Sequence, residues 1–463
     1  MIRLLIAAPA SGSGKTVVTC ALLTALQKRG LNPCAFKCGP DYIDPMFHRS
    51  VPGVESRNLD LFLSDADKVR ALFARSIRGR GAAVCESAMG FYDGLGGTTD
   101  AVSAWRVADT LNLPVLLTVR AEGAGLSLAA VIRGMRDFRK HSRIAGVILN
   151  DCPPALCRTL APTLERETGV PILGCLPRIP EAELESRHLG LHTAAEIRNL
   201  RERFQILAET LENCADMPRL LSIYDDGAEA EASAPETRKP SDVRIAVARD
   251  EAFSFAYAET LETLEFCGAE LVFFSPLRES SPPDGVSGLY LPGGYPELYA
   301  EALSENTSMR ESVAAAVRDG TPTVAECGGF LYLGKALRDA DGRTFPMTGV
   351  LSGEGFSRGK LVRFGYGTLS ADADSLLFRA GESVPVHEFH HWDSTENGNA
   401  LQMTKPVTGR SWRCGFVTES LYAGFPHLYF AGRPELAERF VNAARRYAGK
   451  GLNRNPRKRH AVE

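Results

Sequence analysis

The stretch IRLLIAAPASGSGKTVV, residues 2–18, carries the clearest structural signal in this chain. Residues 2–7 are mostly apolar and predict a buried strand, and residues 15–29 place apolar side chains at helical spacing. A glycine-rich loop joins the two elements. Such a loop presents consecutive backbone N–H groups at a helix N-terminus, an arrangement that favours the binding of phosphate groups.

The residue types in this loop indicate a nucleotide site consisting of Gly12, Ser13, Gly14, Lys15 and Thr16. In a P-loop the backbone cradles the phosphates, the lysine reaches the β- and γ-phosphates, and the threonine hydroxyl binds Mg²⁺. We therefore expect ATP as co-substrate, with Mg²⁺. The spacing departs from the usual motif because Pro9 stands where most P-loops have glycine.

Further short apolar runs alternate with segments of helical length, which predicts a mostly parallel sheet covered on both faces. The predicted strands are residues 82–85, 115–119, 144–149 and 171–173, and, after a break, residues 243–248, 270–274, 288–291 and 321–325. The break is acidic, rich in small residues and free of aromatic side chains over residues 225–236, a composition that cannot bury enough apolar surface to fold. We expect an α/β protein with two doubly wound domains.

The predicted boundaries follow from these patterns. Residues 1–212 form an ATP- and substrate-binding domain, residues 213–242 a flexible acidic linker, residues 243–449 a second α/β domain, and residues 450–463 a basic tail.

The composition argues against nucleic-acid binding, membrane binding and a disulfide-stabilised fold. The chain has 463 residues and a formal net charge of −3, so no general positive field is available to bind nucleic acid or an acidic membrane. No apolar stretch approaches the ~20 residues that span a bilayer. The 11 cysteines are an odd number and show no CxxC spacing, which argues against a disulfide framework and for a reduced, cytoplasmic setting.

Four acidic residues follow predicted strands of the first domain: Asp41, Asp44, Glu86 and Asp93. The carboxyl ends of parallel strands converge on one ligand crevice, so these carboxylates are expected near the P-loop metal. Asp93 has an alternative interpretation as a turn residue, since it precedes Gly94.

The second domain contains a candidate nucleophile, Cys327, between a β-rich run and a helical pattern. In a nucleophile elbow the side chain stands above the sheet and the next N–H, here from Gly328, stabilises an oxyanion. Gly294, which follows another strand, is the candidate for the second oxyanion donor.

A cysteine nucleophile needs a base, and His427 is the candidate. A histidine beside apolar residues is more often simply packed, so this assignment has an alternative. Residues 387–391 match the HExxH zinc motif, but Pro385 and the alternating apolar residues around it predict a strand, and the motif requires a helix.

A metal–nucleotide site and a cysteine acyl-transfer site together suit a glutaminase coupled to an ATP site that activates a carboxylate. A P-loop favours γ-phosphoryl transfer and hence an acyl phosphate intermediate. The product is a carboxamide.

The motifs resemble those of the cobyrinate a,c-diamide synthase family of corrin biosynthesis, in the family's order. They lie at residues 6–16, 36–45, 58–60, 89–94, 187–191, 250–255, 291–297 and 387–390. The family's P-loop is similar to that of dethiobiotin synthetases, which fits the displaced glycine. The resemblance implies a class I glutamine amidotransferase domain fused to an ATP-binding amido-ligase domain. It also implies amidation of the a- and c-acetate groups of a cobyrinate-type macrocycle, with glutamine and ATP, in cobalamin biosynthesis.

Carried over by motif, the resemblance implies that Lys15 and Thr16 hold phosphate and Mg²⁺, and that Asp44 and Glu86 are metal ligands. Substrate binding or activation is implied for Asp41, Tyr42, Asp93, Arg187 and His188, and Cys327 and His427 are implied as nucleophile and base. Most class I amidotransferases have a glutamate two residues after the histidine, whereas this chain has Tyr429. Ala325 also replaces the usual glycine of the elbow.

The sequence leaves open the macrocycle, the oligomeric state and one other class of function. The same chemistry suits hydrogenobyrinate or nickel sirohydrochlorin, and whether the chain forms a homodimer is not determined. From another class, a partitioning-type regulatory ATPase with an inert amidotransferase-like domain is conceivable; that class places a signature lysine early in its P-loop, where this chain has Ala8, Pro9 and Ala10.

Overall fold

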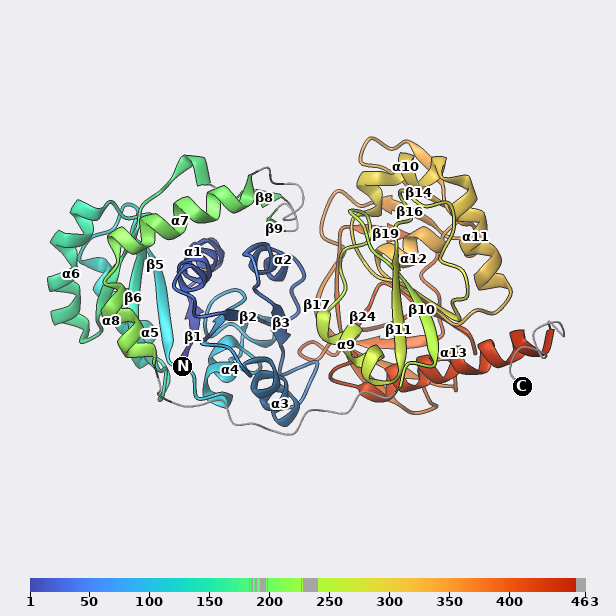
Figure 1. Ribbon diagram of the computed structural model, residues 1–463, viewed down its shortest axis with the longest axis horizontal. Coiled ribbons are helices and arrows are strands. Elements are labelled where there is room, and N and C mark those ends of the chain that lie inside the picture. Colours follow the sequence, from blue (N-terminus) through green and yellow to red (C-terminus); the bar gives the residue numbers. More distant parts are fainter. Residues whose placement is uncertain are drawn as a thin grey trace. The chain divides into compact units, whose positions relative to one another are not determined.

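The computed structural model describes residues 1–182, 184, 186–187, 190–191, 197, 199–225, 227 and 240–454 (Figure 1). The chain divides into two compact units, Met1–Pro235 and Glu236–Glu463. Each unit is described by itself.

The first unit is built on a parallel sheet in the order β3-β2-β4-β1-β5-β6-β7. The strands are β1 (Ile2–Ala7), β2 (Pro33–Cys38), β3 (Ser56–Leu59), β4 (Ala82–Glu86), β5 (Val115–Arg120), β6 (Ile144–Asn150) and β7 (Ile172–Leu176). The order of the strands reverses around β1, so a crevice is expected beyond the carboxyl ends of β1 and its neighbours, where ligands of such sheets bind. The P-loop lies there.

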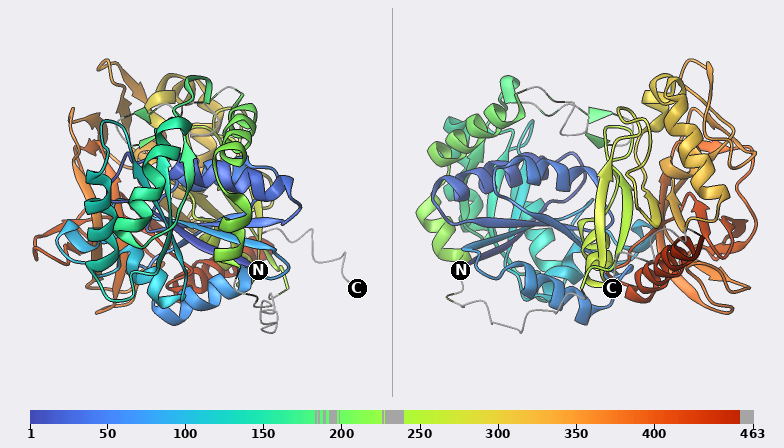
Figure 2. Two further views of the ribbon diagram at one scale, coloured as in Figure 1. Left: turned by 90° about the vertical axis from the view of Figure 1, so that its left-hand side faces the viewer. Right: turned by 45° about the vertical axis from the view of Figure 1, so that its right-hand side comes forward.

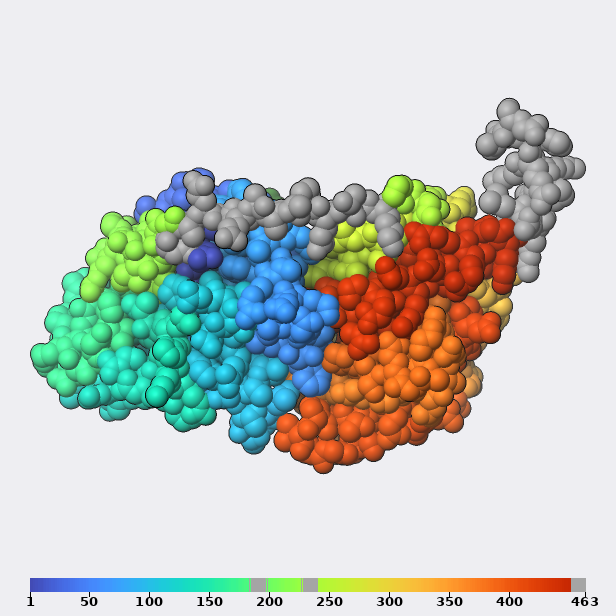
Figure 3. All heavy atoms as spheres, turned by 90° about the horizontal axis from the view of Figure 1, so that it is seen from below, coloured from blue at the N-terminus to red at the C-terminus, as the bar shows by residue number. Residues whose placement is uncertain are grey.

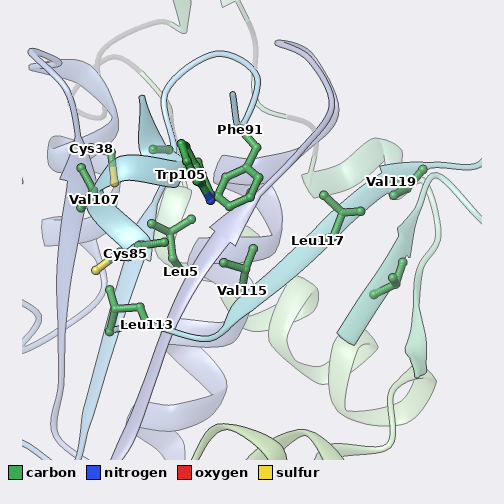
Figure 4. Packing of buried hydrophobic residues seen from close by; sticks show 14 of the residues in the cluster. Leu5, Cys38, Cys85, Phe91, Trp105, Val107, Leu113, Val115, Leu117 and Val119 are labelled. Atoms are coloured by element: carbon green, nitrogen blue, oxygen red, sulfur yellow. The ribbon is translucent and has the colours of Figure 1, made fainter. Parts of the chain in front are cut away.

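Helices cover both faces of this sheet. Figure 1 shows α1 (Lys15–Lys28), α2 (Ile43–Ser50) and α7 (Leu200–Cys214) on one face, and α3 (Ala66–Ser76) and α4 (Ala104–Thr110) on the other. The core beneath α3 and α4 also takes in α5 (Ser127–Asp137) and α6 (Pro154–Thr168), and it includes Leu5, Trp105 and Leu117 (Figure 4). Shorter elements are η1 (Leu95–Gly97), η2 (Pro180–Ala182), β8 (Ser186–Arg187) and β9 (Gly190–Leu191). The expected parallel, doubly wound fold is confirmed.

The predicted linker begins too early. Helix α8 (Met217–Tyr224) lies within it, and Asp216 caps this helix by accepting the Arg219 N–H. Leu220 and Tyr224, one helical turn apart, are buried in the first unit, and the Tyr224 hydroxyl donates to the Val115 carbonyl at 3.1 Å. The prediction was wrong because it followed the acidic composition of the residues after α8. The short run of apolar residues in α8 is nevertheless long enough to pack in the core. Residues 228–239 of the predicted linker lie outside the described residues.

The second unit contains a sheet in the order β11-β10-β12-β13-β23-β22, parallel except for β22. Its strands are β10 (Val243–Ala248), β11 (Ala269–Phe274), β12 (Gly288–Leu291), β13 (Thr323–Glu326), β22 (Phe416–Val417) and β23 (Leu421–Gly424). Two separate apolar cores pack against it, which confirms that this unit too is covered on both faces (Figure 2). One core includes α9 (Ala258–Phe266) and α13 (Pro434–Arg454), and the other α10 (Ala300–Glu305), α11 (Thr307–Arg318) and α12 (Gly328–Leu333). The short η3 (Pro296–Tyr299) follows β12.

Two smaller sheets complete this unit, and the sequence analysis did not anticipate them as sheets. One has the order β21-β20-β17-β18-β24 and is antiparallel; the other has the order β15-β14-β16-β19. Their strands are β14 (Ala336–Arg338), β15 (Thr344–Pro346), β16 (Glu354–Ser357), β17 (Arg363–Ala371), β18 (Ser383–His390), β19 (Trp392–Ser394), β20 (Leu401–Thr404), β21 (Ser411–Cys414) and β24 (His427–Leu428). The predicted strand at the HExxH match is confirmed as β18.

Helix α13 lies at the surface of the second unit (Figure 3). One face of the helix packs in the core, where Leu436, Phe440 and Val441 are buried. It runs to Arg454, so the predicted tail begins too early at residue 450; residues 455–463 lie outside the described residues. Among the helices of the described residues, none combines the length and apolar character needed to cross a membrane.

Candidate active sites

The P-loop is held in shape by glycine and by a residue from a distant strand. Gly12 has φ +76° and Gly14 has φ +88°, values that side chains rarely tolerate. A Cβ on Gly14 would also lie 2.1 Å from the amide nitrogen of Asn150, at the end of β6. That amide donates to the Ser13 carbonyl at 3.2 Å, and the Ser13 hydroxyl donates to the Ala10 carbonyl at 2.9 Å.

Lys15 begins α1 and is buried at the loop. Its ammonium group donates to the Ala10 carbonyl at 3.1 Å. Burial, assisted by the nearby charge of Lys37, lowers the pKa of Lys15 to about 8, although the carboxylates of Glu86, Asp44 and Asp93 oppose the shift. A partly desolvated lysine of this kind binds a phosphate more strongly than a hydrated surface lysine would, because little water must be removed.

The predicted metal ligands Thr16, Asp44 and Glu86 are brought together. The Thr16 hydroxyl donates to Glu86 Oε1 at 2.8 Å and lies 3.3 Å from Asp44 Oδ1. These residues come from the starts of α1 and α2 and the end of β4, elements that meet at the carboxyl edge of the sheet.

Sequence reasoning missed two residues here, Lys37 and His48. The ammonium group of Lys37, at 2% exposure, forms an ion pair with Asp44, lies 2.9 Å from Glu86 Oε1 and donates to the Ser87 carbonyl at 3.1 Å. His48 Nε2 lies 2.8 Å from Glu86 Oε2, and its Nδ1 lies 2.9 Å from the Ser56 hydroxyl. Burial alone would raise the pKa of Glu86, but Lys37 and His48 hold it well below its usual range. Lys37 lies near the end of β2, which is buried throughout. A lysine is unusual in a buried strand, and this was the feature of the sequence that could have identified Lys37 as a site residue.

The other predicted residues of this site divide into three cases. Asp41 Oδ1 accepts the N–H groups of Ile43 and Asp44 at 2.8 and 3.1 Å, so this side chain starts α2, and half-buried Tyr42 follows it. Asp93 Oδ2 accepts the Gly90 N–H at 2.8 Å, which is the alternative turn interpretation, while its charge also acts on Lys15. Arg187 lies in β8 with only its backbone described, and His188 lies outside the described residues.

The oxygen donors at this site suit Mg²⁺. The carboxylates of Asp44 and Glu86 and the hydroxyl of Thr16 converge. Counting Asp41 and Asp93 as well, four carboxylates act on the two buried lysines, Lys15 and Lys37, so negative charge is in excess. Within the described residues no group of three or more His, Cys, Asp or Glu side chains forms a metal cluster. A site with few protein ligands is what Mg²⁺ adopts when substrate phosphates and water complete its shell.

The second site is a strained elbow at Cys327, between β13 and α12. Cys327 has φ +47° and ψ −100°, a conformation that is costly for a residue with a side chain. Its N–H donates to the Gly424 carbonyl at 2.8 Å. Burial raises the pKa of the Cys327 thiol well above its usual range, with Glu297 and Glu388 adding to the shift. The thiol is therefore protonated at neutral pH and needs a base to react.

The two candidate oxyanion donors are neighbours. A Cβ placed on Gly328 would lie 3.0 Å from the Gly294 amide nitrogen, and one placed on Gly294 would lie 2.0 Å from the Ala252 carbonyl oxygen. Both positions therefore require glycine for close backbone approach. The Gly294 amide nitrogen therefore lies close to the Cα of Gly328.

His427 lies beside the same elbow. A Cβ on Gly293 would be 2.6 Å from His427 Cε1 and 3.5 Å from the Cys327 Cβ, so the ring and the cysteine both border the space that the absent side chain of Gly293 leaves open. Nδ1 of His427 is 3.6 Å from Oε2 of Glu326, the residue before the cysteine. The sequence has Tyr429 and not an acid two residues after His427, and no local pattern predicted a role for Glu326.

Comparison with known proteins extends over both units. Residues 4–191 match the CobQ/CobB/MinD/ParA nucleotide binding domain, and residues 244–435 match the CobB/CobQ-like glutamine amidotransferase domain. The chain is 38% identical over 441 residues to the cobyrinate a,c-diamide synthase of Caldanaerobacter subterraneus subsp. tengcongensis, covering 95% of this chain and 97% of that protein. It is 40% identical over 442 residues to the cobyrinate a,c-diamide synthase of Gloeobacter violaceus, covering 95% and 96%.

The chain belongs to the cobyrinate a,c-diamide synthase family. Members of the family are glutamine-dependent amidating ligases, and so is this protein. The nucleotide-binding and amidotransferase matches fall on the first and second units respectively, as the resemblance implied. The regulatory ATPase alternative is set aside by identity that continues through the amidotransferase unit.

Proposed function

We propose that this protein converts the a- and c-acetate carboxylates of cobyrinate to carboxamides, using ATP and glutamine, in cobalamin biosynthesis. The observation that supports it best is the presence in one chain of a P-loop ringed by carboxylates and a strained cysteine elbow beside a histidine. Whole-length identity to cobyrinate a,c-diamide synthases supports the substrate class.

The first unit, in this proposal, is the amido-ligase. Its loop amides and Lys15 bind the β- and γ-phosphates. The oxygens of Thr16, Asp44 and Glu86 would hold Mg²⁺, which would supply charge neutralisation at the phosphates. A substrate carboxylate oxygen attacks the γ-phosphorus, the bond to the β,γ-bridging oxygen breaks, and ADP leaves. Asp41, Tyr42, Asp93, Arg187 and His188 are proposed to bind or orient that substrate.

The second unit, in this proposal, is the glutaminase. His427 takes the thiol proton of Cys327, the sulfur attacks the γ-carboxamide carbon of glutamine, and the amides of Gly294 and Gly328 stabilise the oxyanion. The C–N bond then breaks and ammonia leaves with a proton from the imidazolium, after which water hydrolyses the thioester to glutamate. Ammonia attacks the acyl phosphate in the first unit, inorganic phosphate leaves, and the amide forms.

Mass spectrometry of candidate tetrapyrroles tests the substrate. Cobyrinate, hydrogenobyrinate and nickel sirohydrochlorin are each incubated with the protein, ATP, Mg²⁺ and glutamine. We expect two carboxylates of cobyrinate to become amides, with two ADP formed. A faster double amidation of either other macrocycle would replace cobyrinate as the substrate, and a product without ADP formation would contradict the acyl phosphate route.

A further inference from the structure

Glu326 is a buried acid at the cysteine elbow that the proposed mechanism has not used. It is 1% exposed at the end of β13, directly before Cys327. Its Oε1 accepts the Leu428 N–H at 3.0 Å, and its Oε2 accepts the Tyr290 hydroxyl at 3.1 Å. The same Oε2 lies 3.6 Å from Nδ1 of His427.

The topology accounts for this meeting of residues far apart in the sequence. Strands β13 and β23 pair in parallel, with Glu326 opposite Gly424. The chain then turns through Phe425 and Pro426, so that His427 begins β24 beside the carboxyl end of β13. Glu326 thus contacts both the ring of His427 and the backbone that follows it.

The surroundings of Glu326 favour a carboxylate that faces a transient cation. A buried carboxylate is costly unless hydrogen bonds and a positive charge compensate it. Burial, and then the Glu326 charge, raises the pKa of the Tyr290 hydroxyl well above its usual range, so that group remains a neutral donor. An imidazolium at His427 would supply the positive charge during catalysis.

We propose that Glu326 is the positioning residue for His427. It orients the ring through the 3.6 Å contact between its Oε2 and Nδ1, which leaves Nε2 to take the Cys327 proton, and it stabilises the imidazolium formed as the thiolate attacks. Most class I amidotransferases have a glutamate two residues after the histidine, where this chain has Tyr429. Glu326 takes the role of that glutamate. This inference rests on the proposed roles of Cys327 and His427.

Other ionisable groups also face this site. His387 lies opposite His427 in the pairing of β18 with β24, and burial, followed by the His427 charge, lowers the pKa of His387 well below its usual value. Glu297 and Glu388 act on the Cys327 thiol. Glu326 is the group whose carboxylate contacts a ring nitrogen of His427, at 3.6 Å.

The decisive variant is Glu326→Gln, which keeps the side-chain shape and an acceptor oxygen but removes the charge. We expect kcat/KM for glutamine to fall about 10²- to 10⁴-fold, mostly through kcat. Amidation with ammonia should stay within twofold of the wild type.

The matched control is Glu382→Gln. Glu382 is another largely buried acid of the second unit, but it pairs with Arg433 and Arg439. We expect this variant to leave glutamine kinetics unchanged. If Glu326→Gln does not fold, Glu326→Asp is measured instead; it should show a smaller loss of glutamine use, and wild-type kinetics would overturn the inference.

Two further outcomes separate the inference from the proposed function. Glutamine kinetics within twofold of wild type for Glu326→Gln, or an equal loss with ammonia, overturns the positioning role. The glutamine analogue 6-diazo-5-oxo-L-norleucine should alkylate the wild-type protein at Cys327, as peptide mass spectrometry detects. Labelling elsewhere, with glutamine use retained by Cys327→Ala, would overturn the proposed function itself.

Discussion

Lys15 is a buried lysine whose charge is expected to change within the range of ordinary assay conditions. Burial lowers the pKa of its ammonium group to about 8 in the free protein. A phosphate ligand requires the charged form, so above pH 8 binding of ATP must first add a proton to Lys15. Below pH 8 the group is already charged and no such cost arises.

ATP affinity should therefore be nearly constant from pH 6.5 to 7.5 and fall by up to about tenfold per pH unit above 8. Calorimetry in buffers of different ionisation enthalpy should detect proton uptake on binding at pH 9 and little at pH 7. Constant affinity up to pH 9.5 would show that Lys15 is not the group that limits phosphate binding.

Cys327 is the proposed nucleophile for glutamine. Cys327→Ala should abolish amidation with glutamine and leave amidation with ammonia within about twofold, since the carboxylate is activated in the other unit. Cys267→Ala, at another buried cysteine of the second unit, is the control and should retain both activities. Equal loss with both nitrogen donors after Cys327→Ala would contradict the division of labour between the units.

At the scale of elements, the elbow depends on how closely α12 approaches β12. A Cβ on Gly329 would lie 2.0 Å from the Leu291 carbonyl oxygen, a backbone atom that cannot move without displacing β12. Gly329→Ala should destabilise the second unit by about 1–3 kcal/mol and reduce glutamine use more than ammonia use.

Gly449→Ala is the matched substitution in another helix. Gly449 lies in α13 with nothing within 4 Å of the added Cβ, so alanine should be neutral or stabilise the helix by up to about 1 kcal/mol. Denaturant unfolding of both variants measures the difference. Equal stability of Gly329→Ala and wild type would mean that the elbow tolerates a shift of β12.

At the scale of the whole molecule, each unit has its own sheets and its own apolar packing. Proteins built this way often unfold in more than one step. We expect calorimetry to resolve two transitions, of which ATP with Mg²⁺ raises only the one belonging to the first unit. At a hundredfold excess over its Kd, ATP should stabilise that unit by about 2.7 kcal/mol. A single transition that ATP shifts as a whole would show that the two units unfold together.

Local patterns were sufficient to predict much of this protein. Strand–loop–helix order around Lys15, alternation of strands and helices, and a cysteine at a strand end depend on residues adjacent in the chain, and the structure has all three features. The boundaries near residues 213 and 450 were wrong because short-range composition does not reveal what α8 and the end of α13 pack against.

What the sequence by itself determined was the fold class, the P-loop and the position of the elbow, because each is encoded within a few consecutive residues. Only the tertiary structure placed Lys37 between Asp44 and Glu86, Asn150 against the P-loop, and Glu326 beside His427. Those contacts join residues on different strands and helices. Their proximity follows from strand order and the return of β24 toward β13, which no local pattern specifies.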